Sequence, residues 1–520
     1  MNRTRFISKK KQNHVKHAKK QPITQDDYYI EATELEEQAE RWQLSDLKKT
    51  LRFYIKAMEF YDYALSQAPD KTTMGSFEVY YNKTRLLLKI FTDFTNNNGY
   101  INVFDFIKST DDLSNLECLI SPIEEIVSNF EEGLTRFNDV NVITWDYKFN
   151  LLTAYVTLLE SSDLTGALLI ELLPRFITLT QELIRSQLNE LEENRQLFEA
   201  DNSDADSTGF QQLSPTDKPP SRDGSGVRTN LLENDTEIME VSDQITTTTI
   251  QEVFVNAYKF AETVLETILQ NASNTINEIQ KNYILDTVLK FCSQLDDMIT
   301  TTNLFTYFTN DNSLELSELE ATKLGIKGIT YILQNDLSLL EELLSSTTQV
   351  ARDQGSLLSV KIDVLQLAIS TINEQELSIK WKLSTALSKL LNENKGILSE
   401  KRSKLTASMA HGDELSQTVF QLCLILNTSA DNEMSRWSIK KNIMLQENQH
   451  NENGNRTLEI LKKNARTLLT NSTNMSQIQC GLQETIIDKI KRNYIYQQST
   501  LRINDLESGD GTEYINNWLQ

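Results

Sequence analysis

The distribution of proline constrains the fold of this chain more than any other feature of its sequence. The last of the seven prolines is Pro220, so residues 221–520 contain none. A long β-rich or loop-rich region normally uses proline in its turns. Apolar residues instead recur at intervals of three and four, as in Ile250, Phe254, Ala257, Ala261, Val264 and Ile268. This spacing predicts amphipathic helices, and the alternation typical of strands is almost absent.

The same spacing recurs on both sides of this series. In the first part of the chain we expect two helices within 26–70, then helices over 80–91, 123–137, 143–160 and 164–186. Later apolar stripes run through 316–346, 356–372, 376–392, 414–427, 457–469 and 478–496. The chain is therefore predicted to be all-α.

A loosely repeated pattern indicates how the first helices are organised. The segment 80–87 (YYNKTRLL) recurs as 148–155 (KFNLLTAY), and Asn150 follows Asn82 by 68 residues, which is twice 34. Repeats at multiples of about 34 residues are typical of stacked helix–turn–helix units. Such arrays bind other proteins far more often than they catalyse reactions.

The second of the two helices expected within 26–70 carries a family resemblance. Its Ala57, Tyr61, Ala64 and Pro69 occupy the small, aromatic, small and proline positions that close a tetratricopeptide repeat. This segment resembles the second helix of such a repeat and the turn after it.

The helix before it resembles the first helix of the same repeat, with Ala39 and Trp42 at its small and aromatic positions. The stretch 38–54 also resembles the opening of uncharacterised fungal proteins with tetratricopeptide repeats. The resemblance implies a superhelix of antiparallel helix pairs (an α-solenoid). Proteins of this family bind extended peptides in a concave groove lined by the first helix of each repeat.

The resemblance also implies which residues would line that groove. The corresponding positions here are Glu36, Glu40, Tyr81, Asn82, Arg85, Phe149, Asn150 and Thr153. The lysine and asparagine that clamp a terminal carboxylate in chaperone-binding members are absent from the first repeat. A groove with acidic and aromatic groups would suit a basic, partly apolar segment. Alternatively, Tyr81 and Phe149 simply pack between repeats.

The charge of the chain is uneven. The formal net charge is −23, whereas residues 1–20 carry eight basic side chains and no acidic one. An acidic body attracts basic proteins and repels nucleic acid. A surface kept acidic for solubility is the alternative. Nucleic acid is thus an improbable ligand, except for weak RNA contacts through residues 1–20.

The basic head resembles a nuclear-import signal. Its candidate residues are Lys9, Lys10, Lys11, Lys16, Lys19 and Lys20. A charged tail without a receptor is the alternative. We expect the protein in the cytoplasm, the nucleus or both.

Composition divides the chain into five regions. The stretch 199–232 is rich in Asp, Ser, Pro and Gly and nearly devoid of apolar residues, so it is expected to form a disordered internal loop. The other regions are a basic disordered head (1–24), N-terminal repeats that resemble tetratricopeptide repeats (TPR-like, 25–198), a C-terminal helical repeat region (233–500) and a tail (501–520).

No motif for catalysis, cofactor binding or metal binding is present. The four cysteines lie far apart and are expected to be buried in apolar surroundings: Cys118, Cys292, Cys423 and Cys480. Of the four histidines, His14 and His17 lie among lysines, and His411 and His450 lie far apart. Phosphate-binding loops, nucleophile elbows and His-Glu-x-x-His are absent. We therefore expect no enzyme activity, no metal and no cofactor, and the hydropathy predicts no membrane-spanning helix.

These observations favour a protein-binding module. The first hypothesis is an adaptor or dedicated chaperone that holds a basic protein segment in a TPR-like groove. The alternative is a structural subunit of a larger nuclear or cytosolic assembly that uses its apolar helix faces.

Overall fold

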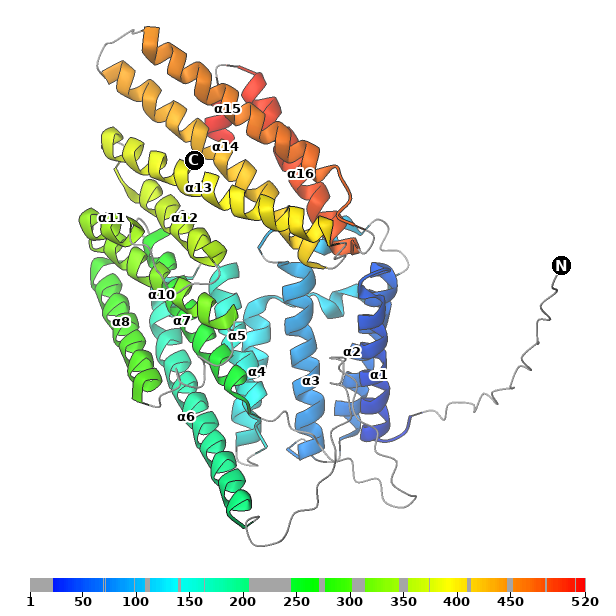
Figure 1. Cartoon of the computed structure of the whole chain (residues 1–520). Helices are drawn as coiled ribbons and strands as arrows, with labels where there is room; N and C mark the ends of the chain where they lie inside the picture. The colour runs from blue at the N-terminus through cyan, green and yellow to red at the C-terminus, as the bar shows by residue number, and fades with distance from the viewer. Residues whose placement is uncertain are drawn as a thin grey trace, which may run out of the picture. The chain divides into compact units, whose positions relative to one another are not determined.

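A computed structural model gives the fold of this protein (Figure 1). It describes residues 22–68, 70, 72–97, 99–107, 113–138, 142–162, 164–204, 245–270, 276–301, 314–345, 354–373, 375–408, 413–446, 452–481, 484–509 and 511–519. The basic head with its six candidate lysines, most of the predicted internal loop and all four histidines lie outside these residues.

Contacts divide the chain into two compact units. The first comprises residues up to 97, 102–143 and 485–487, and the second comprises the remainder. Neither unit ends at the predicted loop of 199–232. The helices of the first unit are α1 (Gln25–Gln43), α2 (Leu47–Gln67), α3 (Met74–Ile90) and α4 (Ile123–Phe137), with a π-helical turn η1 (Phe91–Thr95) and 3-10 helices η2 (Val103–Phe106) and η3 (Leu116–Leu119).

The second unit contains residues 99–101 and the helices from α5 onward, except for 485–487. Its helices are α5 (Trp145–Ser161), α6 (Gly166–Asp204), α7 (Thr247–Gln270), α8 (Glu278–Thr301), α10 (Leu314–Leu333), α11 (Leu337–Ser345), α12 (Gln354–Thr371), α13 (Leu377–Ala407), α14 (Asp413–Gln446), α15 (Glu452–Ser476), α16 (Ile486–Glu507) and α17 (Thr512–Trp518). The described part of the chain contains no β-strand, so the prediction of an all-α fold is confirmed.

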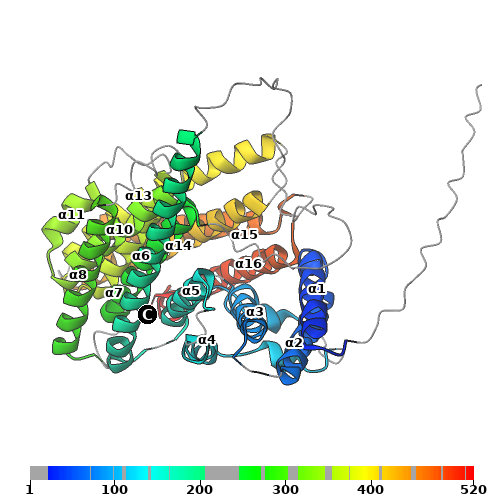
Figure 2. The same ribbon diagram turned by 90° about the horizontal axis from the view of Figure 1, so that it is seen from below.

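The helices of the first unit contact their neighbours along the chain (Figure 2). Contacts at both ends of the α1–α2 pair show that these helices are antiparallel. The Tyr28 and Tyr63 rings lie 5.6 Å apart at one end, and Thr50 Oγ1 donates to the Ala39 carbonyl at the other. Ala57, at a small position of the tetratricopeptide pattern, has no exposed surface.

Local sequence explains where these two helices begin. The Thr24 hydroxyl accepts a hydrogen bond from the Asp27 amide, and the Asp27 carboxylate accepts one from the Thr24 amide, which together form a capping box. The Asp46 carboxylate accepts from the Lys49 amide and caps α2.

One prediction for α1 was wrong. The spacing of Leu35, Ala39 and Trp42 in the sequence predicts one apolar face, but Trp42 is exposed and the Lys49 ammonium lies 3.2 Å from its ring centroid. The buried residues of α1 are Ala32, Glu36 and Ala39. The buried face of α1 therefore begins at Ala32, and its central residue is a glutamate, which apolar spacing does not predict.

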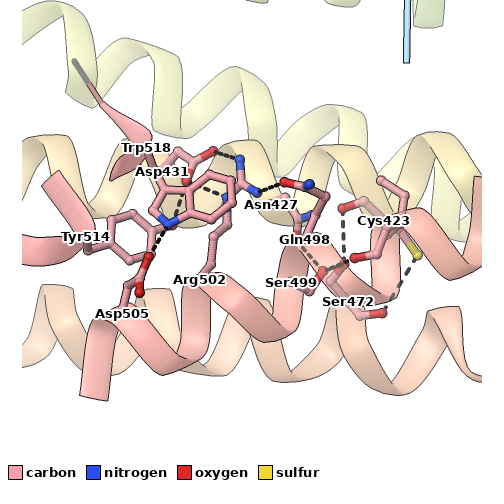
Figure 3. A network of polar contacts seen from close by, with 11 residues as sticks. Cys423, Asn427, Asp431, Ser472, Gln498, Ser499, Arg502, Asp505, Tyr514 and Trp518 are labelled. Carbon is pink, nitrogen blue, oxygen red and sulfur yellow. Dashed lines mark hydrogen bonds and ion pairs between the residues drawn. The ribbon is translucent and has the colours of Figure 1, made fainter. Parts of the chain in front are cut away.

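Helices α13, α14, α15 and α16 run side by side in the second unit (Figure 1). A buried polar network joins the last three (Figure 3). The Ser472 and Ser499 hydroxyls lie 2.9 Å apart, and Ser499 donates to the Asn427 side chain. Each hydroxyl and amide therefore has a partner within the bundle, as buried polar groups require.

The residues predicted as a tail, 501–520, are largely folded. They complete α16 and form α17, in which the buried Tyr514 donates a 2.5 Å hydrogen bond to Asp431 of α14. Asp431 also receives two hydrogen bonds from Arg502, whose guanidinium stacks on the Trp518 ring (Figure 3). This short helix is held by its side-chain contacts with the bundle, which hydrophobic periodicity alone does not reveal.

The described residues contain no helix long and apolar enough to cross a membrane. They contain no group of three His, Cys, Asp or Glu side chains arranged to hold a metal ion. The four cysteines are free thiols, three buried and Cys118 half-buried. The prediction of buried cysteines is thus confirmed for Cys292, Cys423 and Cys480.

Candidate protein-binding site

The predicted groove begins with Glu36, and the structure places this residue inside the first unit. The residue is 5% exposed. One carboxylate oxygen lies 2.5 Å from the Arg85 guanidinium, and the other accepts a 2.9 Å hydrogen bond from the Tyr61 hydroxyl. Glu36 is therefore paired within the chain and is not an open acid.

The charges of this cluster stabilise one another. Burial raises the pKa of Tyr61, and the adjacent Glu36 carboxylate raises it further. Burial opposes the charge of Arg85, but Glu36 outweighs this effect and raises the pKa of the guanidinium. The tyrosine is thus neutral and the arginine charged throughout the physiological range.

The other predicted groove residues of the first unit also have internal partners. Glu40 forms an ion pair with Lys89. The Asn82 amide donates to the Tyr29 hydroxyl at 2.9 Å. Tyr81 is 9% exposed and stacks on Phe77 of the same helix, with 6.0 Å between the ring centroids.

Phe149, Asn150 and Thr153 lie on α5 in the second unit. All three are half-buried, and the Thr153 hydroxyl accepts a 3.0 Å hydrogen bond from Asn256. Five of the eight predicted residues thus belong to the first unit and three to the second. That they bind a partner remains a prediction.

A different group of acids in the second unit has no such partners. The charges of Glu160 of α5 and Asp363 of α12 disfavour the ionisation of Glu266 of α7, and the charges of Glu266 and Asp363 disfavour that of Glu262 on the same helix; we name these four residues the carboxylate face. No described residue forms a hydrogen bond or ion pair with any of them. Each is at least partly exposed.

Surrounding protein raises the pKa values of these carboxyls. Burial raises that of Glu262 to about 8, with repulsion from Glu266 and Asp363 adding to it. Burial and the charges of Asp363 and Glu160 raise the pKa of Glu266 to about 7, and burial alone raises that of Asp363 to about 6. A poorly solvated carboxylate favours a nearby cation.

The positive charge near the carboxylate face is already engaged. Lys259 lowers the pKa values of Glu160 and Glu262, but its ammonium also pairs with Glu318. The backbone of α10 approaches closely at Gly325, where a Cβ atom would lie 1.8 Å from Glu262 Oε1. The Glu262 carboxylate occupies the space that a side chain at residue 325 would fill.

Sequence analysis missed the carboxylate face, although one signal was available. Glu262 and Glu266 are four residues apart on α7, a spacing at which like charges repel across a helix turn. Such a pair has an electrostatic cost that a nearby cation would relieve. The contributions of α5 and α12 come from distant parts of the chain, and the sequence does not indicate them.

Comparison with known proteins identifies relatives of most of the chain. Two family models match: the YNL193W-like protein middle domain at residues 160–334 and the YNL193W C-terminal domain at residues 351–519. The protein YNL193W of Saccharomyces cerevisiae is 37% identical over 519 residues, which cover 94% of this chain and 91% of that protein. The UPF0656 protein C926.02 of Schizosaccharomyces pombe is 43% identical over 75 residues, 14% of this chain and 15% of that one.

A search of solved structures finds a circular tandem repeat protein with novel repeat topology and enhanced subunit contact surfaces. It covers 95% of this chain and 98% of its own, with 11% identity and a TM-score of 0.26. This likeness is too low to indicate a shared fold.

Proposed function

We propose that this chain, which belongs to the YNL193W family, is a non-enzymatic adaptor or dedicated chaperone that holds a basic segment of a partner protein. The observation that carries the proposal is the carboxylate face. Its four acids lack partners among the described residues and are crowded by protein. A lysine or arginine side chain would supply the charge that they lack.

The raised pKa values give this binding a specific signature. Near neutral pH, Glu262 and Glu266 are partly protonated, because their pKa values are about 8 and about 7. A bound cation favours their charged forms and therefore lowers these pKa values. Binding should thus release protons, and the release should shrink at high pH, where both carboxyls are already ionised.

The test uses the full-length protein and a fluorescein-labelled peptide of alternating lysine and alanine. Fluorescence anisotropy should show binding that weakens steeply with salt. The double variant Glu262→Gln/Glu266→Gln should bind several-fold more weakly, whereas Glu37→Gln, an exposed acid on α1, should bind as the wild type does. Calorimetry in buffers of different ionisation enthalpy should detect the released protons. Unchanged affinity in the double variant would reject the carboxylate face as the binding site.

A constitutive structural subunit is the second candidate. It is favoured by Ile279 and Tyr283, which lie one turn apart on α8 and are 82% and 52% exposed. A partner that covers this pair would associate through apolar contacts, with little dependence on salt. Ile279→Ser would then release the partner at both low and high salt.

The finer parts of the hypothesis are also proposals. The antiparallel α1–α2 pair, with its buried Ala39, Ala57 and Ala64, is compatible with a TPR-like repeat. The six lysines of the basic head would direct nuclear import. Their replacement by alanine in a fluorescent fusion would then leave the protein in the cytoplasm.

A further inference from the structure

Helix α13 is basic in a chain that is acidic overall. Its 31 residues include seven lysines or arginines and two acids, whereas the formal net charge of the chain is −23. One of these acids, Glu400, is paired with Lys404 on the same helix. Helix α15 is also poor in acids, since the stretch 460–483 contains none. Positive charge concentrated on part of an acidic protein favours an anionic ligand there.

A hollow of about 380 Å³ lies between α13 and α15, entirely within the second unit. Helix α14 contacts both of these helices and lies between them (Figure 1). The buried Leu422 and Leu426 of α14 form the floor of the hollow. None of the described residues that line it is acidic. The hollow therefore combines an apolar floor with walls that carry no negative charge.

The cationic wall lies on one face of α13. Lys395 and Arg402 are seven residues apart, about two helix turns, and both line the hollow. Arg402 is half-buried and has no hydrogen bond or ion pair with any described residue. The Lys395 ammonium donates a 2.7 Å hydrogen bond to the Asn392 amide and pairs with no described acid. A guanidinium without a counter-ion favours a carboxylate, which it can bind through two parallel hydrogen bonds.

The opposite wall carries two exposed amides. Asn471 and Asn474 lie three residues apart on α15, and neither side chain forms a hydrogen bond with a described residue. A carboxamide both donates and accepts hydrogen bonds, as a peptide group does. Amides facing two cations therefore suit an extended peptide whose backbone lies along α15 and whose acidic side chain reaches α13.

The remaining lining excludes other anionic ligands. Single-stranded nucleic acid is bound by stacking its bases on aromatic rings, and no described residue of this lining is aromatic. Anionic membranes are bound by clusters of about four to eight basic residues, whereas two line this hollow. Ile478, which is 59% exposed, adds an aliphatic rim to the leucine floor. An aliphatic side chain next to the acid would contact this rim and floor.

We propose that the hollow binds an extended acidic segment of a protein. Lys395 and Arg402 would hold the carboxylate of an aspartate or glutamate, while an adjacent aliphatic side chain contacts Leu422 and Leu426. This site goes beyond the proposed function, since the carboxylate face would take a basic segment. The protein would thus carry one site for each sign of charge.

The experiment measures the binding of labelled peptides to the whole chain by fluorescence anisotropy. One peptide carries Leu-Glu-Leu in a neutral frame of serine and glycine, and the other carries Leu-Gln-Leu in the same frame. The acidic peptide should bind about ten-fold more tightly, although the net charge of −23 favours the neutral one. This preference should disappear in Arg402→Gln. Lys404→Gln, which removes the same charge from an exposed position of α13, is the matched control and should keep it.

A second pair of variants tests the hollow itself. Ser399→Trp fills it from an exposed position on α13 and should abolish binding of the acidic peptide. Ser378→Trp, exposed in the first turn of the same helix, is the control and should bind as the wild type does. Replacing both leucines of the acidic peptide by alanine should weaken its binding several-fold.

Two outcomes would overturn the proposal. One is equal binding, or no binding, of the acidic and neutral peptides by the wild type. The other is a preference for the acidic peptide that persists in both Arg402→Gln and Ser399→Trp. Neither outcome bears on the carboxylate face, because the lysine–alanine peptide that tests it should bind Arg402→Gln as tightly as the wild type.

Discussion

Arg85 of α3 and Glu36 of α1 form a largely buried ion pair, with 2.5 Å between guanidinium nitrogen and carboxylate oxygen. The pair joins two helices that are separated in sequence by α2. Tyr61 of α2 donates to the same carboxylate, so one acid receives hydrogen bonds from both neighbouring helices. Glu36 is therefore a structural residue at the centre of the first unit.

Replacing Glu36 by glutamine should destabilise the first unit by about 2–3 kcal/mol, because Arg85 would keep its charge without a counter-ion. Glu37→Gln is the control, since Glu37 and its partner Arg41 are both largely exposed and the change should cost less than about 0.5 kcal/mol. Hydrogen exchange in α1–α3 at increasing urea measures both. Equal stability of the two variants would show that the buried pair contributes nothing.

The carboxylate face should make stability depend on pH. The pKa of Glu262 in the folded protein is about 8, against 4.5 as its ordinary value. Between these values the folded state binds more protons than the unfolded state, so the free energy of unfolding falls as pH rises. Glu262→Gln should flatten this fall between about pH 5 and 8. Thermal unfolding across this range checks it, and a slope identical to the wild type's would contradict the prediction.

Two glycines should respond to alanine in opposite directions. At Gly328 of α10, a Cβ atom would lie 2.6 Å from Val364 of α12, so Gly328→Ala should cost roughly 1–3 kcal/mol. At Gly396, within α13, a Cβ atom meets nothing within 4 Å. There alanine should stabilise the helix by about 0.5–1 kcal/mol. Denaturant unfolding of the two variants measures the two changes in stability. If both changes had the same sign, the close α10–α12 contact at Gly328 would be refuted.

The C-terminal helix α17 should loosen when Tyr514 loses its hydroxyl. In Tyr514→Phe, the Asp431 carboxylate loses a 2.5 Å hydrogen bond, and amide exchange over 512–519 should become about ten-fold faster, equivalent to about 1.4 kcal/mol. Tyr496→Phe, whose hydroxyl has no partner among the described residues, is the control and should exchange as the wild type does. Unaltered exchange in Tyr514→Phe would mean that other contacts hold α17.

Hydrophobic periodicity was sufficient to predict most of the helices. The stripe from Ile250 to Ile268 became α7, and the helix expected over 123–137 became α4 with the same bounds. Periodicity is a local property, and a helix buries a stripe wherever it packs. It therefore predicts elements better than it predicts which unit an element joins.

The contacts that polar residues make in the folded protein could not be predicted from the sequence. Glu36 resembled an open acid because charged residues are usually exposed, and only the fold shows that Arg85 and Tyr61 cover it. Glu160 of α5 and Asp363 of α12 lie about two hundred residues apart in the chain, and the fold brings both close enough to Glu266 of α7 to disfavour its ionisation. Such groupings depend on tertiary structure.

The serine and asparagine layer of α14–α16 has a consequence for how this family can change in length. Ser472, Ser499 and Asn427 can bond to one another only if they lie at the same height along the three helices. A single inserted residue would turn everything beyond it by about 100° and send these hydroxyls into apolar surroundings. Homologues should therefore gain and lose residues at the joints between these helices, while the spans that meet at the layer keep a constant number of residues.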